Sequence, residues 1–170
     1  MKRELLILRH AKSAWDTGAA SDFDRPLAKR GRKAAPRVGR YLAAQGLRPD
    51  FVVSSPALRA KQTVIAVCAE MDIDEESIHW DERIYGGWTT TLIDVLRDSP
   101  DTAVRVLIAG HNPGLESLVE SLSSEPAEIP ADGKLMPTAA VARLEIGCDW
   151  RRLDRGAGRL LSLTRARSLA

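Results

Sequence analysis

The chain alternates between short apolar runs and longer amphipathic segments. The apolar runs predict strands, because a few branched aliphatic residues in a row are typical of a buried strand. Such runs place strands at residues 4–8, 51–54, 78–80, 104–109, 139–146 and 159–163. The amphipathic segments between them predict helices at residues 34–45, 56–71, 90–98 and 114–122.

Local signals indicate where these helices begin and end. Gly46 follows the first helix at the position where glycine commonly ends one. Pro36 leaves two alternatives for its start, a helix that begins near Ala34, which we favour, or a longer helix from Ala28 that is kinked at the proline. Ser55 and Asn112 each precede a proline, so both are expected to be helix N-caps.

The alternation of strand and helix from residue 4 to residue 122 predicts an α/β fold. We expect a three-layer α/β/α sandwich with a mainly parallel central sheet. Residues 123–137 predict a long loop, and the last two strands predict an antiparallel hairpin at the C-terminal edge. The 170 residues are expected to form a single domain, with about the last five residues frayed.

Composition narrows the function classes. The formal net charge of +2 is too small to indicate nucleic-acid binding. Six arginines between residues 151 and 167 predict a solvated tail, with a surface that attracts an acidic partner as the alternative. Cys68 and Cys148 lack the spacing of a disulfide or metal site, and Cys68 is expected to be buried. The N-terminal apolar run is too short for a signal peptide or a membrane span, so we expect a cytoplasmic protein.

Three of the predicted strands end in residues that suit a phosphoryl anion. These ends are Arg9-His10, the segment 54–59 that closes on Arg59, and the segment 110–113 that contains His111. If the strands are parallel, all three ends lie at one edge of the sheet, where ligands bind in open α/β folds. Two of the ends run into helix N-termini, which attract anions, and a guanidinium binds two phosphoryl oxygens at once. No metal is needed for this chemistry, and no metal-ligand spacing is present.

Either histidine is a candidate nucleophile, and His10 is the better one because it follows its strand directly and adjoins an arginine. A neutral imidazole can attack phosphorus and form a phosphoramidate. His111 would then hold the phosphoryl group by charge or by a hydrogen bond. A single histidine at a strand end is more often a packing or capping residue, and only the coincidence of three such ends favours catalysis.

The three segments resemble the histidine phosphatase superfamily, which includes the phosphoglycerate mutases. The matching residues are Leu8-Arg9-His10-Ala11-Lys12-Ser13, residues 54–63 and Gly110-His111-Asn112-Pro113. The short chain and the Arg-His-Ala-Lys-Ser sequence look most like the SixA-type phosphohistidine phosphatase branch. The resemblance implies a nucleophile at His10, a phosphate pocket made by Arg9, Arg59 and His111, a phosphoglycerate mutase-like fold and no cofactor.

The resemblance also suggests a proton donor. Residues 81–86 are similar to the segment around the catalytic glutamate of mutase-like members, so Glu82 is the expected donor. Asp81 is the neighbouring competitor, and Glu82 as a merely exposed carboxylate is the alternative.

Some residues near these motifs depart from the family pattern. Asp16 stands where many relatives have an asparagine, so Lys12 or Ser13 is expected to contact phosphate instead.

Three further side chains are expected to be structural. We expect Trp15 and Trp88 to pack under loops, with a place at the mouth of the site as the alternative. Residues 22–27 could fold over the pocket, with Arg25 paired to Asp24 or reaching the substrate, and a surface ion pair is the favoured interpretation of Arg25. His79 is isolated on a short strand and is expected to be solvated, without a role.

Together these features predict a metal-independent phosphatase that acts through a phosphohistidine at His10. Its substrate would be a phosphorylated protein or a small phosphorylated metabolite, with neither nucleic acid nor membrane as a partner. The alternatives are a mutase-type phosphotransferase and a non-catalytic module that binds a phosphorylated ligand. Nucleic-acid binding through the arginine-rich C-terminal end is a further alternative.

Overall fold

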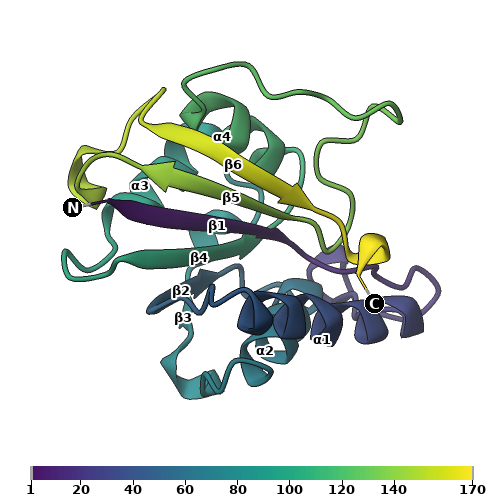
Figure 1. Cartoon of the computed structure of the whole chain (residues 1–170). Helices are drawn as coiled ribbons and strands as arrows, with labels where there is room; N and C mark the ends of the chain where they lie inside the picture. Colours follow the sequence, from purple (N-terminus) through teal and green to yellow (C-terminus); the bar gives the residue numbers. More distant parts are fainter. Residues whose placement is uncertain (1, 170) are drawn as a thin grey trace.

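All the predicted strands are present in the computed structural model, which describes residues 2–169. They form one six-stranded sheet in the order β3-β2-β4-β1-β5-β6 (Figure 1). β2 has the predicted range, and the ends of the other strands differ from the predicted ones by at most two residues. The strands are β1 (Arg3–Arg9), β2 (Phe51–Ser54), β3 (His79–Trp80), β4 (Arg105–Gly110), β5 (Val141–Ile146) and β6 (Gly158–Thr164).

The parallel part of the sheet brings three carboxyl ends to one edge. β4 is parallel to β1 on one side and to β2 on the other, and β2 is parallel to β3. β5 is antiparallel to both β1 and β6, which confirms the C-terminal hairpin. β1, β2 and β4 therefore end side by side.

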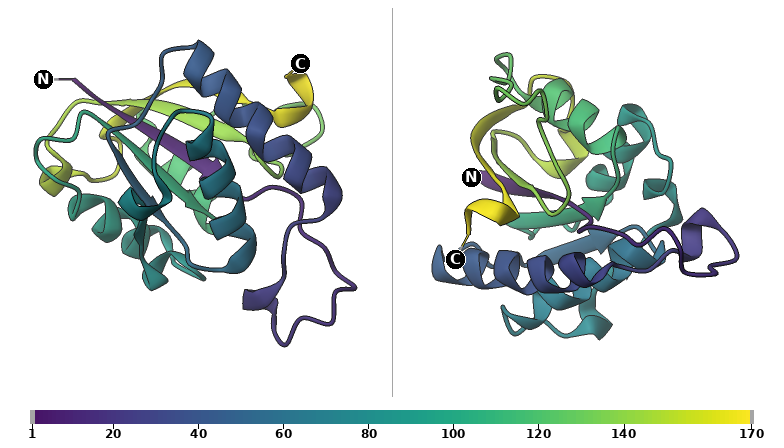
Figure 2. Two further views of the ribbon diagram at one scale, coloured as in Figure 1. Left: turned by 90° about the horizontal axis from the view of Figure 1, so that it is seen from below. Right: turned by 90° about the vertical axis from the view of Figure 1, so that its right-hand side faces the viewer.

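Four α-helices cover the two faces of the sheet, as predicted for an α/β/α sandwich. They are α1 (Lys29–Ala44), α2 (Leu58–Ala69), α3 (Thr89–Arg97) and α4 (Gly114–Leu122). α1 and α2 lie on one face and α3 and α4 on the other (Figures 1 and 2). Side chains alternate along β1, so Leu6 and Leu8 pack in the core under α1 and α2, whereas Leu5 and Ile7 pack in the core under α3 and α4.

The predicted later start of the first helix is wrong, because α1 begins at Lys29 and contains Pro36. The proline removes one backbone donor, which would bond the carbonyl of Arg32, a residue on the exposed side. Buried residues on both sides of the proline, Gly31 before it and Val38 and Leu42 after it, share one face of the helix. Burial of that face outweighs the lost hydrogen bond.

Both predicted N-caps are also wrong. The N-cap of α2 is Ala57, and the hydroxyl of Ser55 instead accepts a hydrogen bond from the Ala57 amide at 3.2 Å. The N-cap of α4 is Pro113, and the side-chain amide of Asn112 donates to Glu116 and to the carbonyl of Met136. Each side chain also contacts a distant segment, Ser55 at His111 and Asn112 at Met136, and neither occupies the N-cap position.

Several short 3-10 helices connect these elements. They cover Asp22–Asp24, Glu75–Ser77, Glu82–Ile84, Trp150–Arg152 and Ala166–Ser168.

Of the last five residues, which are expected to be frayed, residues 166–169 are described and pack against the body of the protein through Ala166 and Leu169, and residue 170 lies outside the described residues. Ala166 is buried, and Arg165 donates to the carboxylate of Asp132. The segment after α4 is a long loop as predicted, with one isolated bridge between Ser123 and Gly158. Figure 1 shows the C-terminal turn beside α1.

None of the described helices combines the length and the apolar character that a membrane crossing would require.

Candidate active site

Two histidine rings meet at the sheet edge where β1 and β4 end. The ring centroids of His10 and His111 lie 5.2 Å apart, although a hundred residues separate them in the sequence. The backbone fixes this approach, because the amide of His10 donates to the carbonyl of Gly110 at 3.0 Å. The amide of Ser55 likewise donates to the carbonyl of Ala109, which joins the end of β2 to the same edge.

His10 is held as a neutral imidazole with one nitrogen free. Its Nδ1 lies 2.7 Å from the carbonyl oxygen of Ala11, a contact that requires Nδ1 to carry the proton and donate. Nε2 therefore keeps its lone pair. Burial, assisted by the nearby charges of Arg59 and Arg9, lowers the pKa of His10 to about 4.

His111 is also neutral, and its environment differs from that of His10. Its Nε2 lies 2.8 Å from the hydroxyl of Ser55. That hydroxyl accepts from the Ala57 amide, and in the tautomer in which it donates its own proton to Nε2 the ring proton of His111 sits on Nδ1. Nδ1 is buried and has no partner within residues 2–169. Burial and then the neighbouring His10 lower the pKa of His111 to about 3.

Arg59 comes from the first turn of α2, and its guanidinium is bound by Asp22. Nη1 donates to the Asp22 carbonyl at 2.7 Å and Nη2 donates to its Oδ2 at 2.9 Å. The same carboxylate accepts from the hydroxyl of Tyr85 and from Arg25. These donors, with Tyr85 first, hold the pKa of Asp22 well below its usual range, so it stays ionised. Arg59 therefore already binds an anionic group.

Arg9 lies at the end of β1, between His10 and the loop that precedes β5. Its Nη1 donates to the carbonyl of Met136 at 3.0 Å, whereas its Nε is buried and unpaired within the described chain. Burial is the main cause that lowers the pKa of Arg9, and the positive charge of Arg59 adds to this effect. The two guanidiniums are thus close enough to repel each other, an arrangement that a bound dianion would relieve.

Thr63 connects the first motif to the second. Its hydroxyl accepts from the amide of Ala11 at 2.9 Å and donates to the carbonyl of Arg59 at 2.7 Å. The segment after β1 and the first turn of α2 are therefore fixed relative to each other by one buried side chain.

Ser13 and Lys12, the two further expected phosphate contacts, differ in their surroundings, and their assignment stays a prediction. The hydroxyl of Ser13 is buried and accepts from Arg25 at 2.6 Å. Lys12 is exposed and lines a separate cavity, which Arg9 also lines.

The acidic candidates lie at the surface. Glu82 is exposed and does not line the cavity beside Arg59 and His111. Asp81 is bound by Arg83, whose Nη2 lies 2.7 Å from Oδ2. The assignment of Glu82 as proton donor stays a prediction.

The structure also tests the expectations for side chains near the site and elsewhere: it differs from those for Arg25, Trp15 and Trp88 and agrees with those for Cys68 and His79. Arg25 pairs with Asp22 rather than with Asp24, and it is buried rather than exposed. Trp15 and Trp88 are exposed by 73% and 80% instead of packing under loops. The face of Trp15 is covered by the guanidinium of Arg25, whose Cζ lies 3.5 Å from the ring centroid. Cys68 is buried and His79 is exposed, as predicted.

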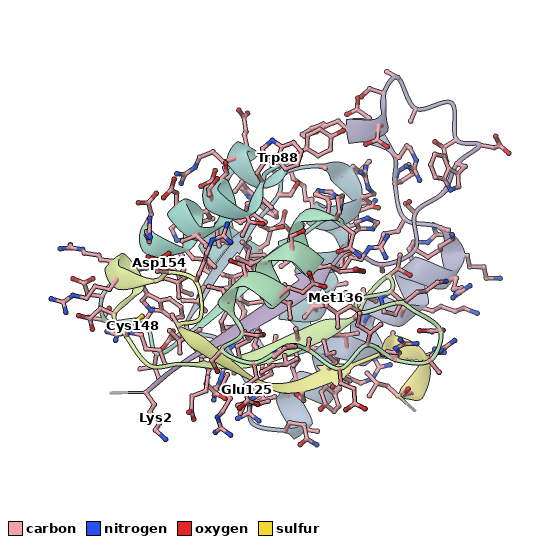
Figure 3. All side chains as sticks on the ribbon, turned by 90° about the horizontal axis from the view of Figure 1, so that it is seen from above. Lys2, Trp88, Glu125, Met136, Cys148 and Asp154 are labelled. Atoms are coloured by element: carbon pink, nitrogen blue, oxygen red, sulfur yellow. The ribbon has the colours of Figure 1, made fainter. Side chains whose placement is uncertain are left out.

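A cavity of about 400 Å³ opens beside the histidine pair, on the side of α3 and α4. Tyr85, Trp88 and Pro113 form its apolar part, and Arg59 and His111 form its polar end. Trp88 is labelled in Figure 3. No local signal in the sequence marks the contacts of Asp22, Tyr85 and Met136 with the two arginines, although a fold of residues 22–27 over the pocket is one of the alternatives that the sequence leaves open.

Among residues 2–169, no group of three or more histidine, cysteine, aspartate or glutamate side chains is arranged to hold a metal ion.

Known proteins resemble this chain over most of its length. It is 34% identical to the uncharacterized protein Rv1276c of Mycobacterium tuberculosis over 158 residues, which cover 91% of this chain and 96% of that protein. It is 32% identical to the uncharacterized chloroplastic protein At3g52155 of Arabidopsis thaliana over 132 residues, or 72% of this chain and 60% of that protein.

The fold is that of solved SixA structures. The structure of the protein histidine phosphatase SixA complexed with tungstate superposes with a TM-score of 0.80 at 25% identity, covering 97% of this chain and 98% of the other. A protein designated phosphohistidine phosphatase SixA from Nakamurella multipartitia gives 0.81 at 25% identity, with 97% and 96% covered. Residues 5–124 match the histidine phosphatase superfamily (branch 1). The chain therefore belongs to the histidine phosphatase superfamily.

Proposed function

We propose that this protein is a phosphatase that works through a covalent phosphohistidine at His10. The observation that carries the proposal is the pair of neutral imidazoles, 5.2 Å apart, beside the guanidiniums of Arg9 and Arg59. Membership of the superfamily and the likeness to SixA support a hydrolase that acts on phosphoryl groups.

The free Nε2 of His10 is the nucleophile. It attacks phosphorus, the bond from phosphorus to the leaving oxygen or nitrogen breaks, and the electron pair of that bond departs with the leaving group, which takes up a proton. Water then attacks the phosphoramidate, releases orthophosphate and returns Nε2 to its free form. The hydrogen bond from Nδ1 to the Ala11 carbonyl holds the ring in place and stabilises positive charge on it in the transition state.

Arg9, Arg59 and His111 hold the phosphoryl oxygens in this proposal. The two arginines supply fixed positive charge where negative charge develops. The unpaired Nδ1–H of His111 is a buried donor with no partner in residues 2–169, so an equatorial oxygen would satisfy it. Loss of either arginine should lower kcat/KM by roughly 10²–10³-fold, as is typical for loss of a transition-state donor.

The proposed substrate class is a phosphohistidine or a phosphomonoester, carried by a protein or a small metabolite. A phosphohistidine leaves through nitrogen, which can already carry a proton, so it depends less on an acid than an alkyl phosphate does. Glu82, the proposed donor, is exposed and far less enclosed than the two histidines. This contrast favours a substrate with a good leaving group.

The proposal is tested by His10→Asn, with His79→Asn as the matched control because His79 is an exposed histidine on β3. Hydrolysis of p-nitrophenyl phosphate should fall more than about 10³-fold in the first variant and stay near the wild-type rate in the second. Rapid quenching in alkaline detergent should trap an acid-labile phosphoryl group on the wild type and on His79→Asn, and none on His10→Asn. Full activity in His10→Asn would refute the proposal.

A mutase-type transfer is the second candidate. It is favoured by a 36% identity over 93 residues to the 2,3-bisphosphoglycerate-dependent phosphoglycerate mutase of Thermobifida fusca, which covers 48% of this chain and 36% of that protein. The open cavity beside His111 favours water as the acceptor instead. Parallel measurement of orthophosphate release and isomer formation from a phosphorylated sugar acid separates the two.

A further inference from the structure

A second cavity is lined by Arg9, which does not line the apolar cavity beside His111. It has a volume of about 550 Å³, and its walls come from the N-terminal half of α1, the loop before β5 and the C-terminal turn. Figure 1 shows the C-terminal turn and α1 side by side at this end of the sheet. In Figure 3 the labelled Met136, which lines this cavity, belongs to that loop.

The cavity concentrates positive charge. Seven of its lining side chains are cationic and two are carboxylates, a local excess of five positive charges in a chain whose whole net charge is +2. The rest of the chain is therefore net negative, so the cationic wall is a local feature. The cationic residues are Arg9, Lys12, Arg30, Arg37, Lys134, Arg165 and Arg167.

The two carboxylates in this cavity are already engaged. Asp132 is bound by Arg165 and Arg167, and Glu116 accepts from the side chain of Asn112 at 2.8 Å. Arg165 also donates to the carbonyl of Lys134 at 2.6 Å, which fixes the loop as a wall. The acidic groups thus build the cavity and leave other cations available.

Five of the cations form no ion pair with the described residues: Arg9, Lys12, Arg30, Arg37 and Lys134. Arg30 and Arg37 are seven residues apart on α1, which places them on one face about 10 Å apart along the axis. Several unpaired cations line one cavity, so a ligand with linked anionic groups can contact more of them at once than a single orthophosphate can.

We propose that this cavity binds a second phosphate-class group of a small substrate whose other phosphoryl group is transferred at His10. The inference rests on the proposed function and names its substrate class, a small polyphosphorylated molecule. Arg9 lines this cavity and also lowers the pKa of His10 through its charge, so it connects the two anion sites. The volume is that of a small-ligand pocket, and walls on three sides distinguish it from a flat basic surface for an acidic protein.

The test uses tripolyphosphate and orthophosphate as probes, with binding to the whole protein measured by calorimetry at low salt. The wild type should bind tripolyphosphate more tightly than orthophosphate. The double variant Arg30→Gln/Arg37→Gln should bind tripolyphosphate about tenfold or more weakly than the wild type, because each lost guanidinium removes a charge-assisted contact. Its affinity for orthophosphate should fall much less. Thermal melting checks that the variant is folded.

Arg151→Gln/Arg155→Gln is the matched control, since it removes the same charge from exposed arginines outside the cavity. It should keep tripolyphosphate affinity within about twofold, as long-range charge is screened in solution. Equal weakening in both double variants would overturn the inference, as would tighter binding of an oligoglutamate peptide than of tripolyphosphate.

The binding experiment does not depend on catalytic activity, so failure of this inference and failure of the proposed function can be told apart. If His10→Asn keeps full phosphatase activity but tripolyphosphate binding depends on Arg30 and Arg37, the proposed function fails and the anion site stands. If His10→Asn is inactive and the double variant binds tripolyphosphate like the wild type, the function stands and this inference fails.

Discussion

Asp22 is hydrogen-bonded to the guanidinium of Arg59, the group that the proposed mechanism assigns to the phosphoryl oxygens of the substrate. Its carboxylate and carbonyl both accept hydrogen bonds from Arg59, and Tyr85 and Arg25 donate to the same carboxylate. A phosphoryl dianion would have to share Arg59 with this negative charge or displace it.

Asp22→Asn should therefore strengthen binding of orthophosphate, because it removes one negative charge and keeps a side-chain oxygen for Tyr85. The expected gain is about threefold to tenfold, the size of one solvent-screened charge interaction at short range. The measurement is the inhibition constant of orthophosphate against p-nitrophenyl phosphate hydrolysis. Asp24→Asn is the control, since Asp24 is a neighbouring exposed aspartate without a contact to Arg59. Weaker orthophosphate binding in Asp22→Asn would mean that Asp22 positions Arg59 instead.

For single residues, the sequence predicts which side chains follow directly after a strand and so reach the site. It does not predict which loop side chains contact them. His10, Arg9 and His111 follow β1 and β4 directly, so the parallel sheet alone brings them together. The contact of Asp22 with Arg59 depends on how the segment between β1 and α1 folds back, and side-chain spacing in that segment carries no such information. The exposure of Trp88 has the same origin, because a loop tryptophan is buried only where another element covers it.

At the scale of elements, the contact between α1 and the segment after β1 is the closest backbone approach near the site. A Cβ placed on Gly31 would lie 2.2 Å from the carbonyl oxygen of Lys12. The loop from residue 10 to residue 28 stands out from the body and returns at this point (Figure 2). The glycine thus permits α1 to pack against the chain that carries Lys12 and Ser13.

Gly31→Ala should destabilise the protein by about 1–3 kcal/mol, since a backbone carbonyl cannot move aside as a flexible side chain would. Ala has the higher helix propensity, so a helix effect alone would have the opposite sign. The free energy of unfolding in urea measures this. Lys33→Ala on the exposed side of α1 is the control and should change it by less than about 0.5 kcal/mol. A more stable Gly31→Ala variant would show that the segment after β1 moves away at little cost.

The fold was more predictable from strands than from helix ends. Four consecutive apolar residues in β1 are buried on both faces, so the run itself identifies the strand. The start of α1 was missed because a proline signal is local, whereas the buried face that continues through Pro36 depends on the sheet beneath it. Ser55 and Asn112 look like caps in sequence, yet distant partners, His111 and Met136, take up their side chains.

For the whole molecule, the two buried histidines connect stability to pH. Both have folded-state pKa values well below 6.5, at about 4 for His10 and about 3 for His111. Below pH 6.5 the unfolded chain binds more protons than the folded one, so stability is fully present above that pH and falls as the pH drops toward 4.

Between pH 7 and about pH 5 the wild type should lose up to about 2 kcal/mol of unfolding free energy for each histidine. The double variant His10→Gln/His111→Gln should lose less over the same interval, because neither glutamine titrates. Urea titrations at both pH values give the loss within each protein, so any baseline difference between the proteins cancels. Equal losses would mean that the histidines accept protons while the protein is folded.

The position of β1 in the sheet determines when its backbone opens during unfolding. β1 has β4 on one side and β5 on the other, and Leu5 to Leu8 are fully buried. Its amides should exchange with deuterium only through opening of the entire protein, in contrast to β3 and β6 at the edges. The strand that carries His10 would thus be among the last to open, and a denaturant that spares the overall structure would leave the proposed nucleophile where it is.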